Sequence, residues 1–224
     1  MKMGLNQKGS LAVVLAGLLA GVMRVSALPL NLDPLLEAEP DLFSSELYIS
    51  YEESSDAFSA TGNTSIYTVP GPIQYDVIDN GTPPFALPGT FELLATIDET
   101  GTLVSGTVTI GGRIPDYGVS PVQTLLTGTL TQFGFDTGNP AKFEFLFNVT
   151  GGALAGDYGP VAGIIMDNYG SSFAGSFTAS FDNDSTGVAD TRPLIPEPST
   201  ALLVGCAGAG LAIVARRSRI VPRS

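Results

Sequence analysis

The sequence predicts an all-β domain, either an antiparallel β-sandwich or a barrel-like fold, flanked by an N-terminal signal peptide and a C-terminal transmembrane helix. Apolar and polar residues alternate in the middle of the chain, most clearly at Phe143, Phe145 and Phe147. This period of two is typical of half-buried strands. Turn sequences such as the Asp-Asn-Gly at 79–81 separate the apolar runs at short intervals. The length of 224 residues suits one compact domain with short appendages.

Residues 1–27 have the features of a secretory signal peptide. Lys2 and Lys8 precede an apolar run at 11–23, and small residues occupy the positions before Ala27. We therefore expect the chain to use the Sec translocon and signal peptidase, with cleavage after Ala27. The alternative is an uncleaved anchor, although the apolar run is short for a membrane span.

The segment after the signal peptide is expected to lead into the β domain. Residues 28–45 are rich in Pro, Leu and acidic residues, which favours an extended lead-in or one short helix. The acidic β domain is then expected at 46–181. Its expected strands are 47–51, 66–69, 73–78, 91–97, 104–110, 125–133, 142–149, 161–166 and 173–181.

Residues 182–195 are expected to form a linker. They combine Asp, Asn, Ser, Thr and Gly with few apolar residues, so they offer little to bury. Such a segment would tether the β domain to whatever follows it.

The C-terminal segment 196–224 combines three elements in order. Pro196, Glu197 and Pro198 come first, an apolar span follows at 201–215, and a basic tail occupies 216–224 with Arg216, Arg217, Arg219 and Arg223. An apolar helix followed by a basic cluster is typical of a stop-transfer segment whose cations stay in the cytoplasm. The two prolines keep their tripeptide extended and outside the membrane. A plain C-terminal anchor is the alternative interpretation.

This order of elements resembles the PEP-CTERM sorting signal, also called the ice-binding protein C-terminal domain, over residues 195–224. The resemblance implies recognition of Pro196, Glu197 and Pro198 by an exosortase-like membrane protease that cleaves nearby. It further implies an inner-membrane precursor and a product at the cell surface or in the extracellular matrix. Exopolysaccharide and other envelope components are the partners that the resemblance suggests.

The charge distribution excludes one large class of partner. Residues 28–200 contain all 22 acidic residues but only three of the ten basic ones, which gives a net charge of −19. Such a surface repels nucleic acid, whose binding requires clustered Lys and Arg. It attracts cations and cationic polymers.

The residue inventory limits catalysis. The chain has no His and only one Cys, which lies in the C-terminal apolar span, so His-based triads and exported thiol nucleophiles are excluded. No cofactor is expected. Carboxylate pairs at 52/53, 76/79 and 98/99 remain as candidates for glycoside hydrolysis. Asp182 and Asp184 resemble the start of a calcium loop, although Pro193 replaces the Glu of a true EF-hand.

Two runs of threonine raise a further alternative. Thr107 and Thr109, and separately 127, 129 and 131, alternate along expected strands. An ice-binding surface requires such a ladder on several neighbouring strands, whereas the β propensity of Thr explains two short runs equally well.

These observations favour a non-enzymatic, exported surface or matrix protein with a structural or adhesive role. Two alternatives remain open: a secreted carbohydrate-active enzyme and a calcium-dependent binding module, each using carboxylates only. Convergent carboxylates in a pocket would favour the enzyme. Loss of thermal stability on chelation would favour the calcium module.

Overall fold

A computed structural model describes residues 28–33, 39–82, 85–138 and 141–194. Within these ranges the chain is all-β, as predicted, with one four-residue helix and two short 3₁₀ turns. The elements are β1 (Asp41–Glu52), η1 (Glu53–Ser55), β2 (Ala57–Val69), β3 (Ile73–Asp76), β4 (Gly89–Ile97), β5 (Leu103–Ile114), η2 (Pro115–Tyr117), β6 (Val119–Asp136), β7 (Ala141–Gly151), α1 (Ala155–Tyr158), β8 (Val161–Asn168), β9 (Phe181–Asp182) and β10 (Gly187–Pro193).

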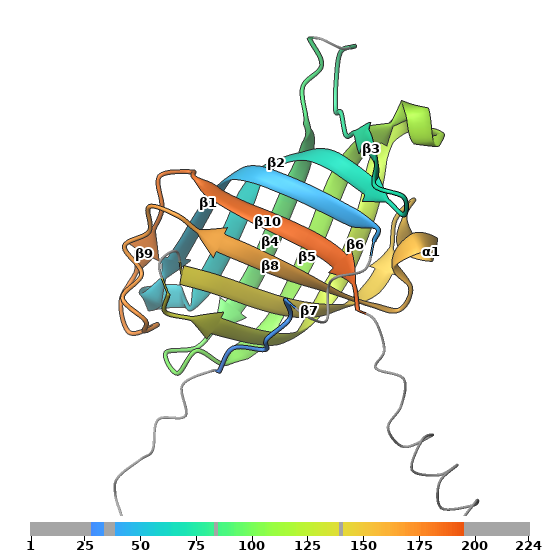
Figure 1. Cartoon of the computed structure of the whole chain (residues 1–224). Coiled ribbons are helices and arrows are strands. Elements are labelled where there is room, and N and C mark those ends of the chain that lie inside the picture. Colours follow the sequence, from blue (N-terminus) through green and yellow to red (C-terminus); the bar gives the residue numbers. More distant parts are fainter. Residues whose placement is uncertain (1–27, 34–38, 83–84, 139–140, 195–224) are drawn as a thin grey trace, which may run out of the picture.

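Eight strands close into an antiparallel barrel (Figure 1). Their order is β1-β2-β4-β5-β6-β7-β8-β10, and β10 pairs again with β1. The short strands β3 and β9 extend the sheet beside β2 and β1. The barrel-like alternative of the predicted fold class is therefore confirmed.

The interior of the barrel is filled with aromatic side chains. On β7 the alternating Phe143, Phe145 and Phe147 are fully buried, as their period of two predicts. Phe143 and Phe145 meet Phe58 of β2 and Phe133 of β6 with ring centroids 4.7–6.1 Å apart. The inside of the barrel is thus a packed core, as in other small barrels.

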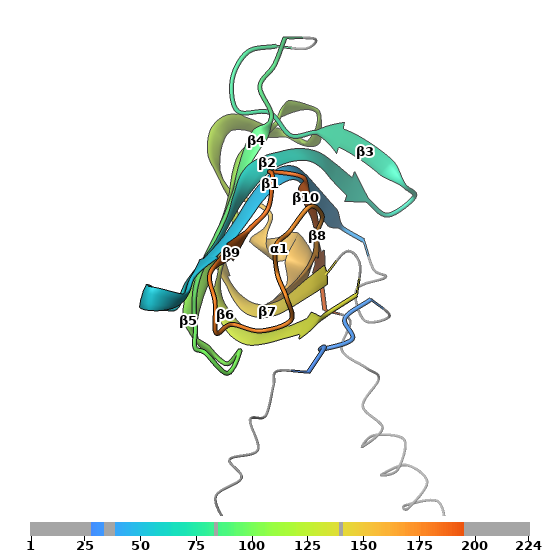
Figure 2. The same cartoon turned by 90° about the vertical axis from the view of Figure 1, so that its left-hand side faces the viewer.

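Each end of the barrel is covered by a connection between strands (Figure 2). At one end α1 inserts Tyr158, which is buried and donates a hydrogen bond to the backbone oxygen of Thr191 at 2.9 Å. At the other end the segment 169–180 contributes Phe173 and Phe177, whose rings contact the core aromatics. The predicted strand at 173–181 is therefore wrong except at its last residue, because these rings pack inward from a loop.

The predicted linker at 182–195 is also wrong. Residues 187–193 form β10, which lies between β8 and β1 and closes the barrel. Its inward positions carry Gly187, Ala189 and Thr191, which are small because bulky neighbours occupy the interior. A Cβ at Gly187 would lie 2.9 Å from Ile49 Cδ1.

The predicted lead-in at 28–45 overlaps the barrel, because β1 begins at Asp41. Residues 28–33 contain no helix and cross the outside of β6 and β7. The buried carboxylate of Glu144 accepts hydrogen bonds from the backbone N–H groups of Asn31 and Leu32, each at 2.9 Å. Lys142 adds an ion pair with Asp33 at 2.8 Å.

The predicted signal peptide at 1–27, with its cleavage after Ala27, lies outside the described residues. The same holds for the expected sorting signal at 196–224 with its apolar span and arginines. Within the part of the chain that the structure describes, none of the helices has the length and apolar character needed to cross a bilayer.

Candidate functional site

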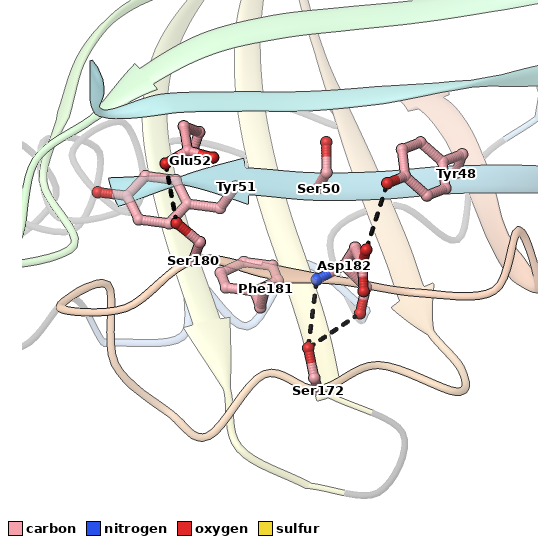
Figure 3. A pocket seen from close by; sticks show the side chains of 8 residues that line it. All are labelled: Tyr48, Ser50, Tyr51, Glu52, Ser172, Ser180, Phe181 and Asp182. Carbon is pink, nitrogen blue, oxygen red and sulfur yellow. Dashed lines mark hydrogen bonds between the residues drawn. The ribbon is translucent and has the colours of Figure 1, made fainter. Parts of the chain in front are cut away.

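A polar groove lies on the outer surface of the barrel where β9 pairs with β1 (Figure 3). We call it the β1–β9 groove. Its volume is about 330 Å³. It is lined by Tyr48, Ser50, Tyr51, Glu52, Ser172, Ser180, Phe181 and Asp182.

The groove follows from the alternation of the two strands. Along β1, Tyr48, Ser50 and Glu52 face outward, whereas the residues between them are buried. On β9, Phe181 is buried and Asp182 is exposed, and Ser50 pairs with Asp182 in the ladder. The outward side chains of two distant segments therefore share one face.

The inward side chains of the same strands fasten the groove to the core. Tyr51 and Phe181 are paired in the ladder and their rings stack with centroids 5.6 Å apart. Phe177 meets the Tyr51 ring edge-on at 4.9 Å. The floor of the groove is therefore anchored in the aromatic core.

Asn183 fixes the point at which β9 and β10 diverge beside β1. Its side chain is buried, accepts a hydrogen bond from Ile49 N at 2.9 Å and donates one to Leu47 O at 3.1 Å. It also donates to Asn168 Oδ1 at 3.0 Å. The amide thus replaces ladder hydrogen bonds that the diverging strands do not make, and it holds β9 in register.

Hydroxyl groups hold the two carboxylates of the groove. Ser180 donates a hydrogen bond to Glu52 Oε1 at 3.1 Å, and Tyr48 donates one to Asp182 Oδ2 at 3.4 Å. Ser172 Oγ bridges the backbone N–H and oxygen of Asp182 at 3.3 and 3.4 Å. Within the described residues, Glu52 Oε2 and Asp182 Oδ1 accept no hydrogen bond, so each carboxylate has one oxygen available to a ligand.

Both tyrosines at the groove remain neutral donors at physiological pH. The negative charge of Asp182 raises the pKa of Tyr48 above its ordinary value. Burial, followed by the charge of Asp56, raises the pKa of Tyr51 to about 12. The Tyr51 hydroxyl accordingly donates to Asp56 Oδ1 at 3.2 Å.

Only one of the two predicted metal-ligand candidates lies in the groove. Asp182 lines it, whereas Asp184 is exposed in the turn that follows β9. Within the described ranges, no three or more acidic or Cys side chains are grouped so as to hold a metal ion.

The expected carboxylate pairs do not form the groove. Glu52 lines it, but its chain neighbour Glu53 belongs to η1. Asp98 instead closes a turn by accepting hydrogen bonds from the backbone N–H groups of Thr100 and Thr102, each at 2.9 Å.

The two threonine runs do lie side by side on the barrel. Thr107 pairs with Thr129, and Thr109 pairs with Thr127. The ladder ends there, because Glu92 of β4 and Asn148 of β7 occupy the next positions. This array of two strands lacks the repetition that an ice-binding plane requires.

Sequence reasoning did not bring Glu52 and Asp182 together. They are diagonal neighbours across the β1–β9 ladder, since Asp182 pairs with the residue two positions before Glu52. No local spacing reveals this pairing, because β1 and β9 lie far apart in the sequence. The result is an open site with an aromatic ring, hydroxyl donors and two carboxylates, which suits a ligand rich in hydroxyl groups.

We compared the chain with protein-family models, curated proteins and solved structures, and none of the three comparisons found a match.

Proposed function

We propose that this chain is an exported bacterial surface or exopolysaccharide-matrix protein, sorted through its C-terminal tail, with a non-catalytic, adhesive barrel. The sorting part of the proposal rests on the resemblance of 195–224 to the PEP-CTERM signal, together with the signal peptide expected at 1–27. The adhesive part rests on the β1–β9 groove.

The groove is the single observation that carries the adhesive role. The barrel interior is packed with rings such as Phe143, Phe145 and Phe147, which leaves an internal ligand little space. The groove is a polar recess on the outside, and most of its residues come from β1 and β9, which pair in one ladder. A preorganised recess on an exposed face suits contact with a neighbouring matrix component.

A carbohydrate-active enzyme is the second candidate, because two carboxylates line the groove. Diagonal residues on paired strands are separated by about 7–8 Å at the backbone, and inverting glycosidases need about 6.5–9.5 Å between carboxyl groups. Against this reading, Glu52 and Asp182 are both exposed. A glycosidase acid usually depends on burial to stay protonated. We therefore favour binding without hydrolysis.

Terminal peptide mapping of the protein from membrane, surface and medium fractions tests the sorting proposal. We expect a surface species that starts at Leu28 and ends near Pro196. The variant Glu197→Ala should keep the precursor in the membrane, whereas the nearby Thr200→Ala should be processed normally. A surface protein that retains Arg216 to Arg223 would refute sorting by cleavage.

Hydrolysis is tested separately. Purified full-length protein incubated with oligosaccharides should leave their chain lengths unchanged by mass spectrometry. Shortened products that disappear in both Glu52→Gln and Asp182→Asn would establish the enzyme instead.

A further inference from the structure

We infer that the β1–β9 groove binds a polysaccharide segment bearing free amino groups, such as a chain of glucosamine units. This inference rests on the proposed adhesive function and names the ligand class of its site. Neutral and acidic polysaccharides are the competing ligands that the experiment must separate.

The polar atoms of the groove match a sugar. Seven of its eight lining side chains carry an oxygen that can form a hydrogen bond with a hydroxyl group, and the eighth, Phe181, is aromatic. Tyr48 and Tyr51 have both an aromatic ring and a hydroxyl group. Tyr48 is 41% exposed, so much of its ring is available for contact with a ligand. A volume of about 330 Å³ lies at the lower end for ligand sites. It suits a short part of a chain rather than a whole oligosaccharide.

The charges of the groove select the sugar. Glu52 and Asp182 line it, and no Lys or Arg does. Each carboxylate uses one oxygen on a hydroxyl of the groove, from Ser180 or Tyr48. The other oxygens can therefore accept charge-assisted hydrogen bonds from ammonium groups.

The cations of residues 28–200 are engaged elsewhere. Arg113 donates to Gly81 O at 2.5 Å, Lys142 pairs with Asp33 at 2.8 Å, and Arg192 pairs with Asp41 at 3.1 Å. An anionic polysaccharide would therefore meet two uncompensated carboxylates in the groove and a net charge of −19 around it. A polyamine chain is attracted by both.

The site is preorganised for such a ligand. The register of Ser50 with Asp182 and the hydrogen bonds of Asn183 hold both strands in place. Ser172 orients the backbone of Asp182. Little ordering of the protein remains to oppose binding.

Isothermal titration of the full-length chain with defined oligomers tests the inference. The probes are tetramers of glucosamine, of N-acetylglucosamine and of galacturonic acid. We expect the glucosamine tetramer to bind most tightly, the acetylated tetramer about fivefold more weakly and the acidic tetramer not at all.

Variants connect that preference to the groove. Glu52→Gln and Asp182→Asn should each weaken glucosamine binding about two- to fivefold, without changing binding of the acetylated tetramer. Tyr48→Ala should weaken both, whereas Tyr48→Phe should retain ring contact. Glu92→Gln is the matched control, because Glu92 is exposed on β4 away from the groove. Circular dichroism and thermal melting verify the fold of each variant.

Each contrary result has a distinct meaning. Equal weakening by Glu92→Gln would assign binding to the overall charge and overturn the site. Equal affinity for both hexosamine tetramers would overturn the amine preference but leave the adhesive proposal standing. Absence of binding to all three tetramers would overturn the inference and remove the groove's support for adhesion, whereas failure of tail processing alone would affect only sorting.

Discussion

Asn183→Ala should destabilise the barrel by about 3–4 kcal/mol. The amide accepts a hydrogen bond from Ile49 N and donates to Leu47 O and Asn168 Oδ1, all in buried surroundings. Alanine leaves these three groups without the partner that they have now. An unsatisfied buried group costs about 1–3 kcal/mol, and the lower end of that range applies where water can enter the vacated space.

Equilibrium urea unfolding measures this change. It is followed by circular dichroism, since the chain has no Trp for fluorescence detection. The midpoint should fall while the slope stays constant. Asn148→Ala is the matched control: Asn148 is exposed on β7 and its side chain makes no hydrogen bond to the described residues. The control should change the unfolding free energy by less than about 0.5 kcal/mol. Equal effects of the two substitutions would refute the role assigned to Asn183.

Three further predictions follow from the described residues. Burial, followed by the charge of Asp190, raises the pKa of Asp41 from 3.8 to about 6. The contribution of Asp41 to the free energy of unfolding therefore falls by about 3 kcal/mol as the pH rises from about 4 to 6. Asp41→Asn should gain stability relative to the wild type over that range in urea unfolding at each pH, and parallel curves would contradict this. Gly128→Ala should lower the free energy of unfolding by about 1–3 kcal/mol, because its Cβ would overlap the Phe147 ring. Gly156→Ala is the control, because the space around Gly156 is open. Equal melting temperatures of the two variants would count against the packing argument. The melting temperature should be the same in EDTA and in calcium, since no metal-holding group of side chains occurs in the described ranges; a drop on chelation would revive the calcium module.

The sequence predicted the strands whose two faces differ strongly. β7 alternates Phe143, Phe145 and Phe147 with outward residues, and the structure confirms it. The sequence did not predict β10 because its inward residues, Ala189 among them, are small and two of its outward residues, Asp190 and Arg192, are charged. The large apolar side chains that pack against β10 belong to other elements, so the sequence of β10 itself shows no apolar alternation.

The sequence identified only single residues of the candidate site and not their arrangement. Asp182 drew attention as part of a calcium-like spacing, but its partner in the structure is the segment around Ser50. Phe173 and Phe177 suggested a strand because apolar residues recur at even spacing. In the structure they are loop residues whose rings cover one end of the barrel. Both cases depend on contacts between distant segments, which local periodicity does not encode.

The pairing of the first strand with the last has a consequence for folding kinetics. Leu42 pairs with Thr191, so the final closure joins residues from opposite ends of the barrel sequence. Contacts of such high sequence separation form late and slowly. A chain that emerges from its N-terminus cannot complete this closure until Thr191 has emerged. Until that moment one edge of β1 stays open to other strands, so slow closure leaves the folding chain exposed to aggregation.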